Sequence, residues 1–310
     1  MSSPRRLGID VGGTKCMAVA LGASGAVIDE MRCPTPKAPD LVIDTVAELA
    51  QSMLPWDSIG VGMPGLVTRN GVLRAAPNLV SIRDLKVGEL LGNRLGCFVH
   101  VDSDATCAAA AEWKLGAGRG IDDFVMITLG TGIGGGLVAS GALMRGTNGF
   151  AGEIGHMVVD PNGPPCPCGR RGCWERYASG AGLAWLAQRA NGDQGVARAI
   201  ELAGGQAAEV RGEHIASAAR EGDAGALAVV DDYGRWVALG LVNLTNILDP
   251  AMFVLGGGLA ATADVFLAPI QRWFGELLYA PDLRSHPALT FAQLGEHAGA
   301  IGAALLADVH

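Results

Sequence analysis

Three of the seven cysteines lie within eight residues of one another, in a stretch that runs from residue 149 to residue 180. They are Cys166, Cys168 and Cys173, and His156 stands ten residues before the first of them. One imidazole and three thiolates are a ligand set of closed, tetrahedral zinc sites. The sequence therefore predicts a structural zinc ion held by these four residues. Two alternatives are a disulfide with one spare thiol, and three unrelated thiols.

Two glutamates, Glu153 and Glu175, flank the four predicted ligands along the chain. Glycines and prolines separate the cysteines, and these residue types permit the tight turns that such a short loop needs. A zinc ion bound here would fix His156 and draw both carboxylates toward one pocket.

The composition limits the classes of protein to consider. At 310 residues the chain is long enough for two domains, and with 49% hydrophobic and 17% charged residues it is globular. The net charge is -8 and no basic run is present, which argues against nucleic acid and anionic membranes as partners. Any bound phosphate must therefore be held by local backbone donors.

Residues 124–144 carry no charge, so a membrane-spanning helix is one reading of this stretch. Its glycines, which gather in the run GTGIGGG, would weaken such a helix. The first residues contain no apolar run of signal-peptide length. We expect a cytoplasmic protein without a membrane partner, in which the reduced thiols of the cysteine cluster are free to bind metal.

The chain opens with strands predicted at 7–11, 15–21 and 27–31, joined as an antiparallel unit. The turn after the first strand contains Gly12, Gly13 and Thr14, whose backbone N–H groups and hydroxyl are suited to phosphate oxygens. Asp10 precedes this turn, and its carboxylate could hold Mg²⁺ directly or through water. The alternative is an ordinary hairpin turn.

A second glycine-rich turn repeats this pattern weakly, between strands predicted at 123–128 and 135–140. Two such hairpins predict two similar lobes and suit a triphosphate better than a single phosphate. A third glycine turn, at residues 256–258, follows a buried strand predicted at 252–255. Its bare backbone would allow a flat group such as adenine to lie against it.

Asp104 lies where a strand predicted at 97–101 leads into an alanine-rich helix that starts at Ala105. Asp102 or Ser103 is expected to cap this helix. A carboxylate at such a junction is well placed for acid–base chemistry. The alternative is that all three polar residues only cap the helix.

The glycine-rich segment 116–120 predicts a domain boundary. We expect an N-terminal α/β lobe over residues 1–117, with a closing helix at about 298–310 packed back on it. The C-terminal α/β lobe is expected over residues 118–297, with a zinc loop at 156–175. Further helices are predicted at 40–54, 87–95, 182–190, 195–202, 212–221, 225–248 and across most of 259–279, with strands at 58–63 and 288–292.

The ordered set of motifs resembles the ROK family of sugar kinases and repressors, from about Leu7 to Leu306. The motifs are LGIDVGGTK, GMPG, DSDATCAAAAE, TLGTGIGGGL, GEIGH, CPCGRRGCWE and VLGGGL. The resemblance implies a two-lobed, actin-like (ribonuclease-H-like) ATPase fold with the active-site cleft between the lobes. It also implies a homodimer or a dimer of dimers. Six residues precede Leu7, so we do not expect the DNA-binding domain of the family repressors.

The activity that the resemblance implies is phosphorylation of a hexose at its 6-hydroxyl by ATP with Mg²⁺, with glucose expected first. Asp104 matches the catalytic base. Nucleotide-binding positions are matched by Asp10, Gly12, Gly13, Thr14, Lys15, Thr131, Gly132, Gly256 and Gly257. Sugar-contacting positions are matched by Gly65, Asn78, Glu153, His156 and Glu175. His156 would place one ring nitrogen on zinc and the other toward a sugar hydroxyl.

One residue departs from the family pattern, because Ser103 stands where the family usually has asparagine before the catalytic aspartate. An amide reaches further than a hydroxyl and offers both a donor and an acceptor. We expect Ser103 to contact substrate and to alter sugar affinity or preference. The alternatives to a glucose kinase are an N-acetylglucosamine, N-acetylmannosamine or other hexose kinase, and a non-catalytic sugar-sensing protein.

Overall fold

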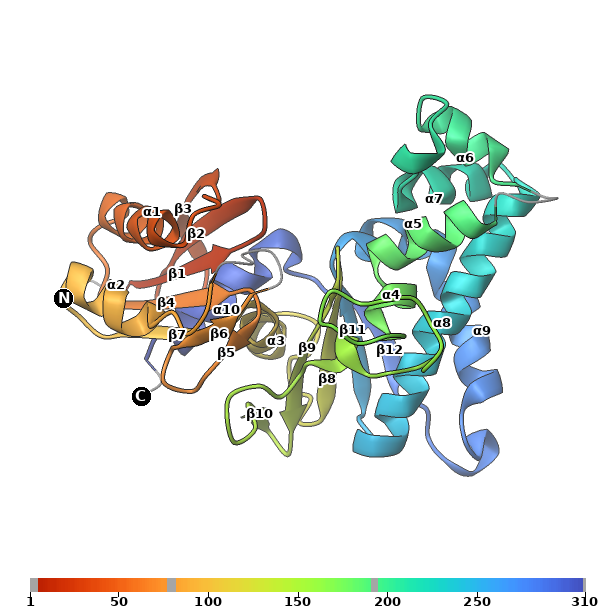
Figure 1. Cartoon of the computed structure of the whole chain (residues 1–310). Coiled ribbons are helices and arrows are strands. Elements are labelled where there is room, and N and C mark those ends of the chain that lie inside the picture. The colour runs from red at the N-terminus through yellow and green to blue at the C-terminus, as the bar shows by residue number, and fades with distance from the viewer. Residues whose placement is uncertain (1–4, 77–81, 191–194, 309–310) are drawn as a thin grey trace. The chain divides into compact units, whose positions relative to one another are not determined.

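The computed structural model describes residues 5–76, 82–190 and 195–308 (Figure 1). Contacts between residues divide the chain into two compact units. The first comprises Met1–Met126, Gly135–Gly152 and Ala292–His310, and the second comprises Ile127–Gly134 and Glu153–Phe291. Both units combine helices with strands, which confirms the predicted α/β class.

The first unit contains a five-stranded sheet in the order β3-β2-β1-β4-β7. Its strands are β1 (Arg6–Val11), β2 (Lys15–Leu21), β3 (Val27–Pro34), β4 (Ser58–Met63) and β7 (Val99–Ser103). Strands β1, β2 and β3 pair antiparallel, as predicted, whereas β4 pairs parallel with both β1 and β7. Parallel neighbours need a crossover connection, and helix α1 (Pro39–Ser52) leads from β3 back to β4.

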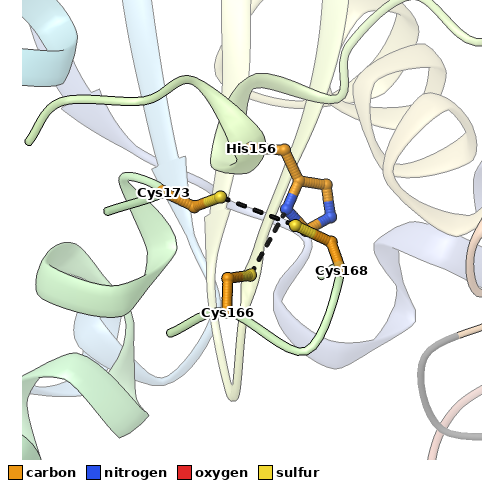
Figure 2. Close-up of side chains that lie close together, drawn as sticks. All are labelled: His156, Cys166, Cys168 and Cys173. Atoms are coloured by element: carbon orange, nitrogen blue, oxygen red, sulfur yellow. Dashed lines mark hydrogen bonds between the residues drawn. The ribbon is translucent and has the colours of Figure 1, made fainter. Parts of the chain in front are cut away.

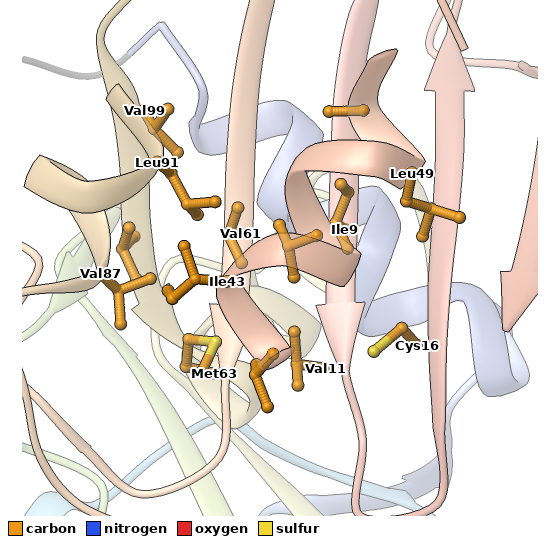
Figure 3. Packing of buried hydrophobic residues seen from close by; sticks show 14 of the residues in the cluster. Ile9, Val11, Cys16, Ile43, Leu49, Val61, Met63, Val87, Leu91 and Val99 are labelled. Carbon is orange, nitrogen blue, oxygen red and sulfur yellow. The ribbon is translucent and has the colours of Figure 1, made fainter. Parts of the chain in front are cut away.

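One face of this sheet carries the apolar core of the first unit (Figure 3). Successive side chains of a strand point to opposite faces. Leu7, Ile9 and Val11 of β1 are therefore buried together, in one cluster with residues of α1 and α2 (Val87–Leu95).

The opposite face carries glycines where helix α10 (Ala298–Leu306) packs on the sheet. A Cβ atom on Gly8 would lie 1.9 Å from the carbonyl oxygen of Ala300, and one on Gly60 would lie 2.0 Å from that of Ala303. Only glycine therefore permits this close approach at these two positions. Asp10 points to the same face, because it stands two residues after Gly8 in the strand.

The strand before Asp104 differs from the prediction. It covers Val99–Ser103, not residues 97–101, because β7 pairs with β4 as far as the partners Met63 and Ser103. The other elements of the first unit are β5 (Leu66–Val67), β6 (Leu73–Ala75), α3 (Asp104–Leu115), β10 (Ala142–Met144) and the 3₁₀ helix η5 (Gly295–His297). Strand β10 was not predicted.

A second five-stranded sheet has the order β10-β9-β8-β11-β12. It includes β8 (Phe124–Leu129), β9 (Ile133–Ala139), β11 (Met252–Gly256) and β12 (Ala288–Phe291). The helices of the second unit are α4 (Glu175–Ala178), α5 (Gly180–Arg189), α6 (Ala197–Leu202), α7 (Gly212–Arg220), α8 (Ala224–Leu248) and α9 (Ala263–Leu277), with 3₁₀ turns η1 (Ile154–His156), η2 (Ala207–Glu209), η3 (Gly258–Thr262) and η4 (Pro281–Leu283). Helix α8 packs on α9, where the rings of Tyr233 and Phe266 meet edge to face.

The charge-free stretch 124–144 forms strands β8, β9 and β10, so the membrane-helix alternative is wrong there. Across the ranges that the structure describes, no helix combines the length and the apolar character needed to cross a bilayer.

Candidate active site

Asp104 is the first residue of helix α3 and follows the last residue of strand β7. Its Oδ1 atom accepts hydrogen bonds from the backbone N–H of Ala105 at 2.7 Å and from the hydroxyl of Ser103 at 3.4 Å. Burial raises the pKa of Asp104, and these two hydrogen bonds act in the opposite direction. A carboxylate with a raised pKa is a stronger base, which suits proton transfer from a hydroxyl.

Asp102 or Ser103 was expected to cap helix α3 with its side chain, and neither forms such a cap. Ser103 occupies the N-cap position of α3, but its side chain makes no capping hydrogen bond. Its hydroxyl donates to Asp104 instead, and Asp102 accepts from the N–H of Ser103 at 2.9 Å. The polar residues of this turn therefore bind one another and leave the helix end without a side-chain cap.

Asp10 is a second carboxylate on the α10 face of the first sheet. A Cβ atom on Gly299 of α10 would lie 2.7 Å from Asp10 Cγ, so the helix covers this side chain closely. The Oδ1 atom of Asp10 is buried and has no hydrogen-bond partner among the residues that the structure describes. Burial first and the charge of Asp104 second raise the pKa of Asp10 to about 7, against the opposing charge of Lys15. A buried oxygen without a donor fits the coordination of a hard cation such as Mg²⁺.

The first glycine hairpin is held by Thr35, the residue that follows strand β3. The N–H of Gly12 donates to the carbonyl of Lys15 at 2.9 Å, and the hydroxyl of Thr35 donates to the carbonyl of Gly12 at 2.8 Å. Gly13 and Thr14 remain exposed at the tip of the turn. The backbone of the turn is thus held in place while these two residues stay accessible to solvent, which is compatible with phosphate binding by their N–H groups.

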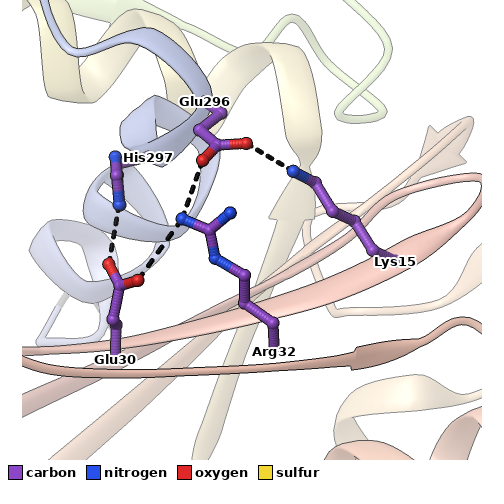
Figure 4. A network of polar contacts seen from close by, with 5 residues as sticks. All are labelled: Lys15, Glu30, Arg32, Glu296 and His297. Atoms are coloured by element: carbon purple, nitrogen blue, oxygen red, sulfur yellow. Dashed lines mark hydrogen bonds and ion pairs between the residues drawn. The ribbon is translucent and has the colours of Figure 1, made fainter.

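Lys15 forms an ion pair with Glu296 of η5 (Figure 4). Glu296 also pairs with Arg32 at 2.7 Å, while Glu30 pairs with His297 at 2.8 Å. The bond from Lys15, followed by the bond from Arg32, lowers the pKa of Glu296. The predicted nucleotide-binding lysine is therefore already engaged by a carboxylate that the sequence did not suggest.

The second and third glycine turns belong to the second unit. In the second turn Thr131 is exposed, and the N–H of Gly130 donates to the carbonyl of Gly132 at 3.1 Å. In the third turn, Gly257 has a φ of 82° and its position leaves no room for a side chain, because a Cβ atom would lie 2.5 Å from the carbonyl oxygen of Leu129. Gly256 is buried, whereas Gly257 is exposed.

Two residues predicted to contact sugar lie in the segment after β4. Gly65 has a φ of 106°, and a Cβ atom there would lie 2.2 Å from the carbonyl oxygen of Ala75. The close approach of β6 thus requires glycine at this position. Asn78 lies outside the described residues.

The four predicted zinc ligands gather in the second unit (Figure 2). Their ligand atoms all lie within 4.8 Å of one another. The Sγ atoms of Cys168 and Cys173 are 3.6 Å apart, and Cys166 Sγ is 3.8 Å from His156 Nδ1. With Zn–S bonds of about 2.3 Å, ligand atoms of a tetrahedral site lie roughly 3.8 Å apart. All seven cysteines are described and free, so the structure contains no disulfide and the geometry fits a zinc ion.

The ring of His156 has different partners at its two nitrogens. Nδ1 faces the cluster, 3.7 Å from Oε1 of Glu175, whereas Nε2 lies 3.9 Å from Oε2 of Glu153. Glu175 also accepts a hydrogen bond from Cys166 at 3.0 Å. With Nδ1 on a metal ion, Nε2 would carry a proton and could donate it in a hydrogen bond.

The loop that carries the cysteines is anchored on both sides of Cys173. Trp174 is fully buried, and its indole N–H donates to the carbonyl of Trp236 in α8 at 2.8 Å. The hydroxyl of Tyr177 donates to Asp160 at 2.7 Å. Gly172 has a φ of 65°, and a Cβ atom there would lie 1.6 Å from the carbonyl oxygen of Asp160. These contacts hold the cluster, and Glu175 with it, at a fixed place on the second unit.

A family model described as ROK matches residues 6–309. The chain belongs to the ROK family. Among its ROK relatives, the glucokinase of Streptomyces coelicolor is 37% identical over 307 residues, which is 97% of this chain and 96% of that protein. The N-acetylmannosamine kinase of Escherichia coli is 33% identical over 306 residues, 97% of this chain and 98% of that protein.

The solved structure of a ROK family glucokinase from Streptomyces griseus, in complex with glucose and AMPPNP, superposes with a TM-score of 0.88. It is 35% identical, and the match covers 98% of this chain and 99% of that one. The predicted actin-like ROK fold is thereby confirmed.

The sequence did not suggest a role for three residues near the site. Thr35 binds Gly12, Glu296 pairs with Lys15, and Arg145 pairs with Asp102, and each of these contacts joins residues that are remote in the chain.

Proposed function

We propose that the protein is an ATP-dependent glucokinase, which transfers the γ-phosphoryl group of ATP to the 6-hydroxyl of glucose. The observation that carries the proposal is Asp104, a carboxylate with a raised pKa that is fixed at the strand-to-helix junction by Ser103 and Ala105. Support for glucose comes from the glucokinases of S. coelicolor and S. griseus, which resemble the chain over nearly its whole length.

In this mechanism Asp104 accepts the proton of the sugar hydroxyl as the new bond from the sugar oxygen to the γ-phosphorus forms. The bond from the γ-phosphorus to the β,γ-bridging oxygen breaks, and ADP leaves. The N–H groups of the first and second glycine turns, together with Thr14 and Thr131, bind phosphate oxygens, and the turn at Gly256 and Gly257 receives the adenosine. Asp10 would hold Mg²⁺, which would supply positive charge to balance that of the phosphates. Glycine hairpins position the donor and take no part in proton transfer.

Sugar contacts are assigned to Gly65, Asn78, Ser103, Glu153, His156 and Glu175. A zinc ion on His156, Cys166, Cys168 and Cys173 would be structural, because four protein ligands leave no open position for substrate. With Nδ1 on that ion, His156 would donate from Nε2 to a sugar hydroxyl, and the fixed ring would orient that hydrogen bond. We propose a homodimer or a dimer of dimers as the assembly.

A second candidate is N-acetylmannosamine phosphorylation, which the E. coli relative favours. ADP release measured with glucose, mannose, N-acetylglucosamine and N-acetylmannosamine separates the two. We expect the highest kcat/KM with glucose, and a loss of about 100-fold or more in kcat for Asp104→Asn. Asp44→Asn is the matched control, because Asp44 is a partly exposed aspartate of helix α1 whose carboxylate pairs with Arg94. ADP release with none of the sugars would contradict the proposal and favour a sugar-sensing protein.

A further inference from the structure

A group of three ionisable side chains, two of them buried, lies next to the turn that carries Asp104, within the first unit. Its members are His100 and Asp102 of β7, which are 8% and 4% exposed, and Arg145, which follows β10. Arg145 Nε lies 2.6 Å from Asp102 Oδ2, and Arg145 Nη2 lies 3.3 Å from His100 Nε2. A buried carboxylate is costly unless it is paired, so Asp102 depends on this guanidinium.

Asp102 uses its two oxygens in different directions. Oδ2 faces Arg145, while Oδ1 accepts the hydrogen bond from the N–H of Ser103 at 2.9 Å. Ser103 is the N-cap residue of α3, and Asp104 is the first residue of that helix. The carboxylate of Asp102 thus ties the guanidinium to the backbone that orients both Ser103 and Asp104.

Arg145 is itself fixed by its loop. Its carbonyl accepts a hydrogen bond from the N–H of Ala151 at 3.1 Å, and the next carbonyl, of Gly146, accepts one from Arg69 Nε at 2.7 Å. Gly149 packs so closely that a Cβ atom would lie 2.5 Å from the carbonyl oxygen of Val67. The guanidinium is therefore presented to Asp102 from a closed loop.

We propose that Arg145 is a positioning residue for the catalytic base. It neutralises Asp102 and holds it so that the bond from Ser103 N–H to Asp102 Oδ1 fixes the turn that aims Asp104. Without Arg145, the buried carboxylate of Asp102 would lose its arginine partner two residues from the base. It would turn toward His100, whose Nε2 lies 3.6 Å from Asp102 Oδ2, or toward water. The inference rests on the proposed kinase activity and deepens it.

The test compares Arg145→Met with Arg94→Met, a control that removes an arginine paired with Asp44 on the surface of the same unit. Both are assayed for sugar phosphorylation well below their melting temperatures. We expect Arg145→Met to lose roughly 10- to 100-fold in kcat with the KM for ATP unchanged, because displacing a catalytic group by about 1 Å costs on the order of 100-fold. Arg145→Lys keeps the positive charge and should therefore have a kcat between those of Arg145→Met and wild type. If Arg145→Met does not fold, the kcat of Arg145→Lys is compared with that of wild type instead.

Asp102→Asn supplies the second arm, because its amide oxygen still accepts from Ser103 N–H but carries no charge. The double variant Asp102→Asn/Arg145→Met should have a higher kcat than Arg145→Met alone. A kcat of Arg145→Met within about twofold of that of Arg94→Met would overturn the inference, as would a double variant no better than Arg145→Met. A wild-type protein inactive on every sugar would instead overturn the proposed function.

Discussion

The Oε2 atom of Glu175 lies 2.8 Å from the point that a Cβ atom on Gly132 would occupy. Glu175 stands two residues after Cys173 and accepts a hydrogen bond from Cys166, whereas Gly132 belongs to the second glycine turn. The carboxylate beside the cysteine cluster therefore also limits the space at the proposed phosphate-binding turn.

Gly132→Ala should weaken ATP binding, because either the turn or Glu175 must move to admit the new methyl group. We expect a rise of roughly 10-fold in the Kd for ATP, about 1.4 kcal/mol, measured by calorimetry. Gly130→Ala is a matched control in the same turn, since a Cβ atom there would meet nothing within 4 Å. Equal ATP affinity in the two variants would show that the contact with Glu175 does not shape the nucleotide site.

Cys168→Ser should lose zinc and activity together, because the ligand geometry and the order of the loop are coupled. Elemental analysis should find about one zinc per wild-type chain, the occupancy of a single four-ligand site, and much less in the variant. Cys97→Ser is the control, since Cys97 lies outside the cluster and is half-buried. An unchanged zinc content in Cys168→Ser would contradict the assigned ligand set.

Asp10 makes stability depend on pH. Its pKa is raised from 3.8 to about 7, so between these values the folded state holds a proton that the unfolded state releases. The stabilisation associated with this proton is complete below about pH 4 and is lost as the pH rises to about 7.

Asp10→Asn should therefore raise the melting temperature relative to wild type in magnesium-free buffer, and more at pH 8 than at pH 5. The difference in unfolding free energy should grow by about 1.4 kcal/mol for each unit by which the pH rises between 3.8 and about 7. Thermal unfolding of both proteins at the two pH values measures this, and the same variant should lose activity if Asp10 holds Mg²⁺. A difference independent of pH would count against a raised pKa at Asp10.

Ser103→Asn should change the KM for sugar, or the preference among sugars, more than kcat. The hydroxyl of Ser103 lies 3.4 Å from Oδ1 of Asp104, and an asparagine here would place a longer side chain with a donor and an acceptor beside the proposed base. Steady-state kinetics on the four sugars measure the change. If the variant matches wild type on all four, Ser103 does not touch substrate.

The sequence alone predicted the features that depend on neighbours along the chain. The cysteine group could be identified because its four ligands lie within one short stretch, and the glycine turns because strands with alternating side chains flank them. The place of Asp104 between a strand and an alanine-rich helix made it a candidate for acid–base chemistry, and the match to the ROK motif led to its prediction as the base. Such patterns follow from backbone geometry that repeats every few residues.

Tertiary structure decided how these parts are held. Because β7 pairs with β4 as far as Ser103, the strand ends two residues later than predicted. At that end, Asp102 accepts a hydrogen bond from the N–H of Ser103, and the hydroxyl of Ser103 donates to Asp104. Glu296 meets Lys15 across 281 residues, and Arg145 meets His100 across 45. Contacts at such separations depend on strand order and on the packing of remote loops, which no local pattern encodes.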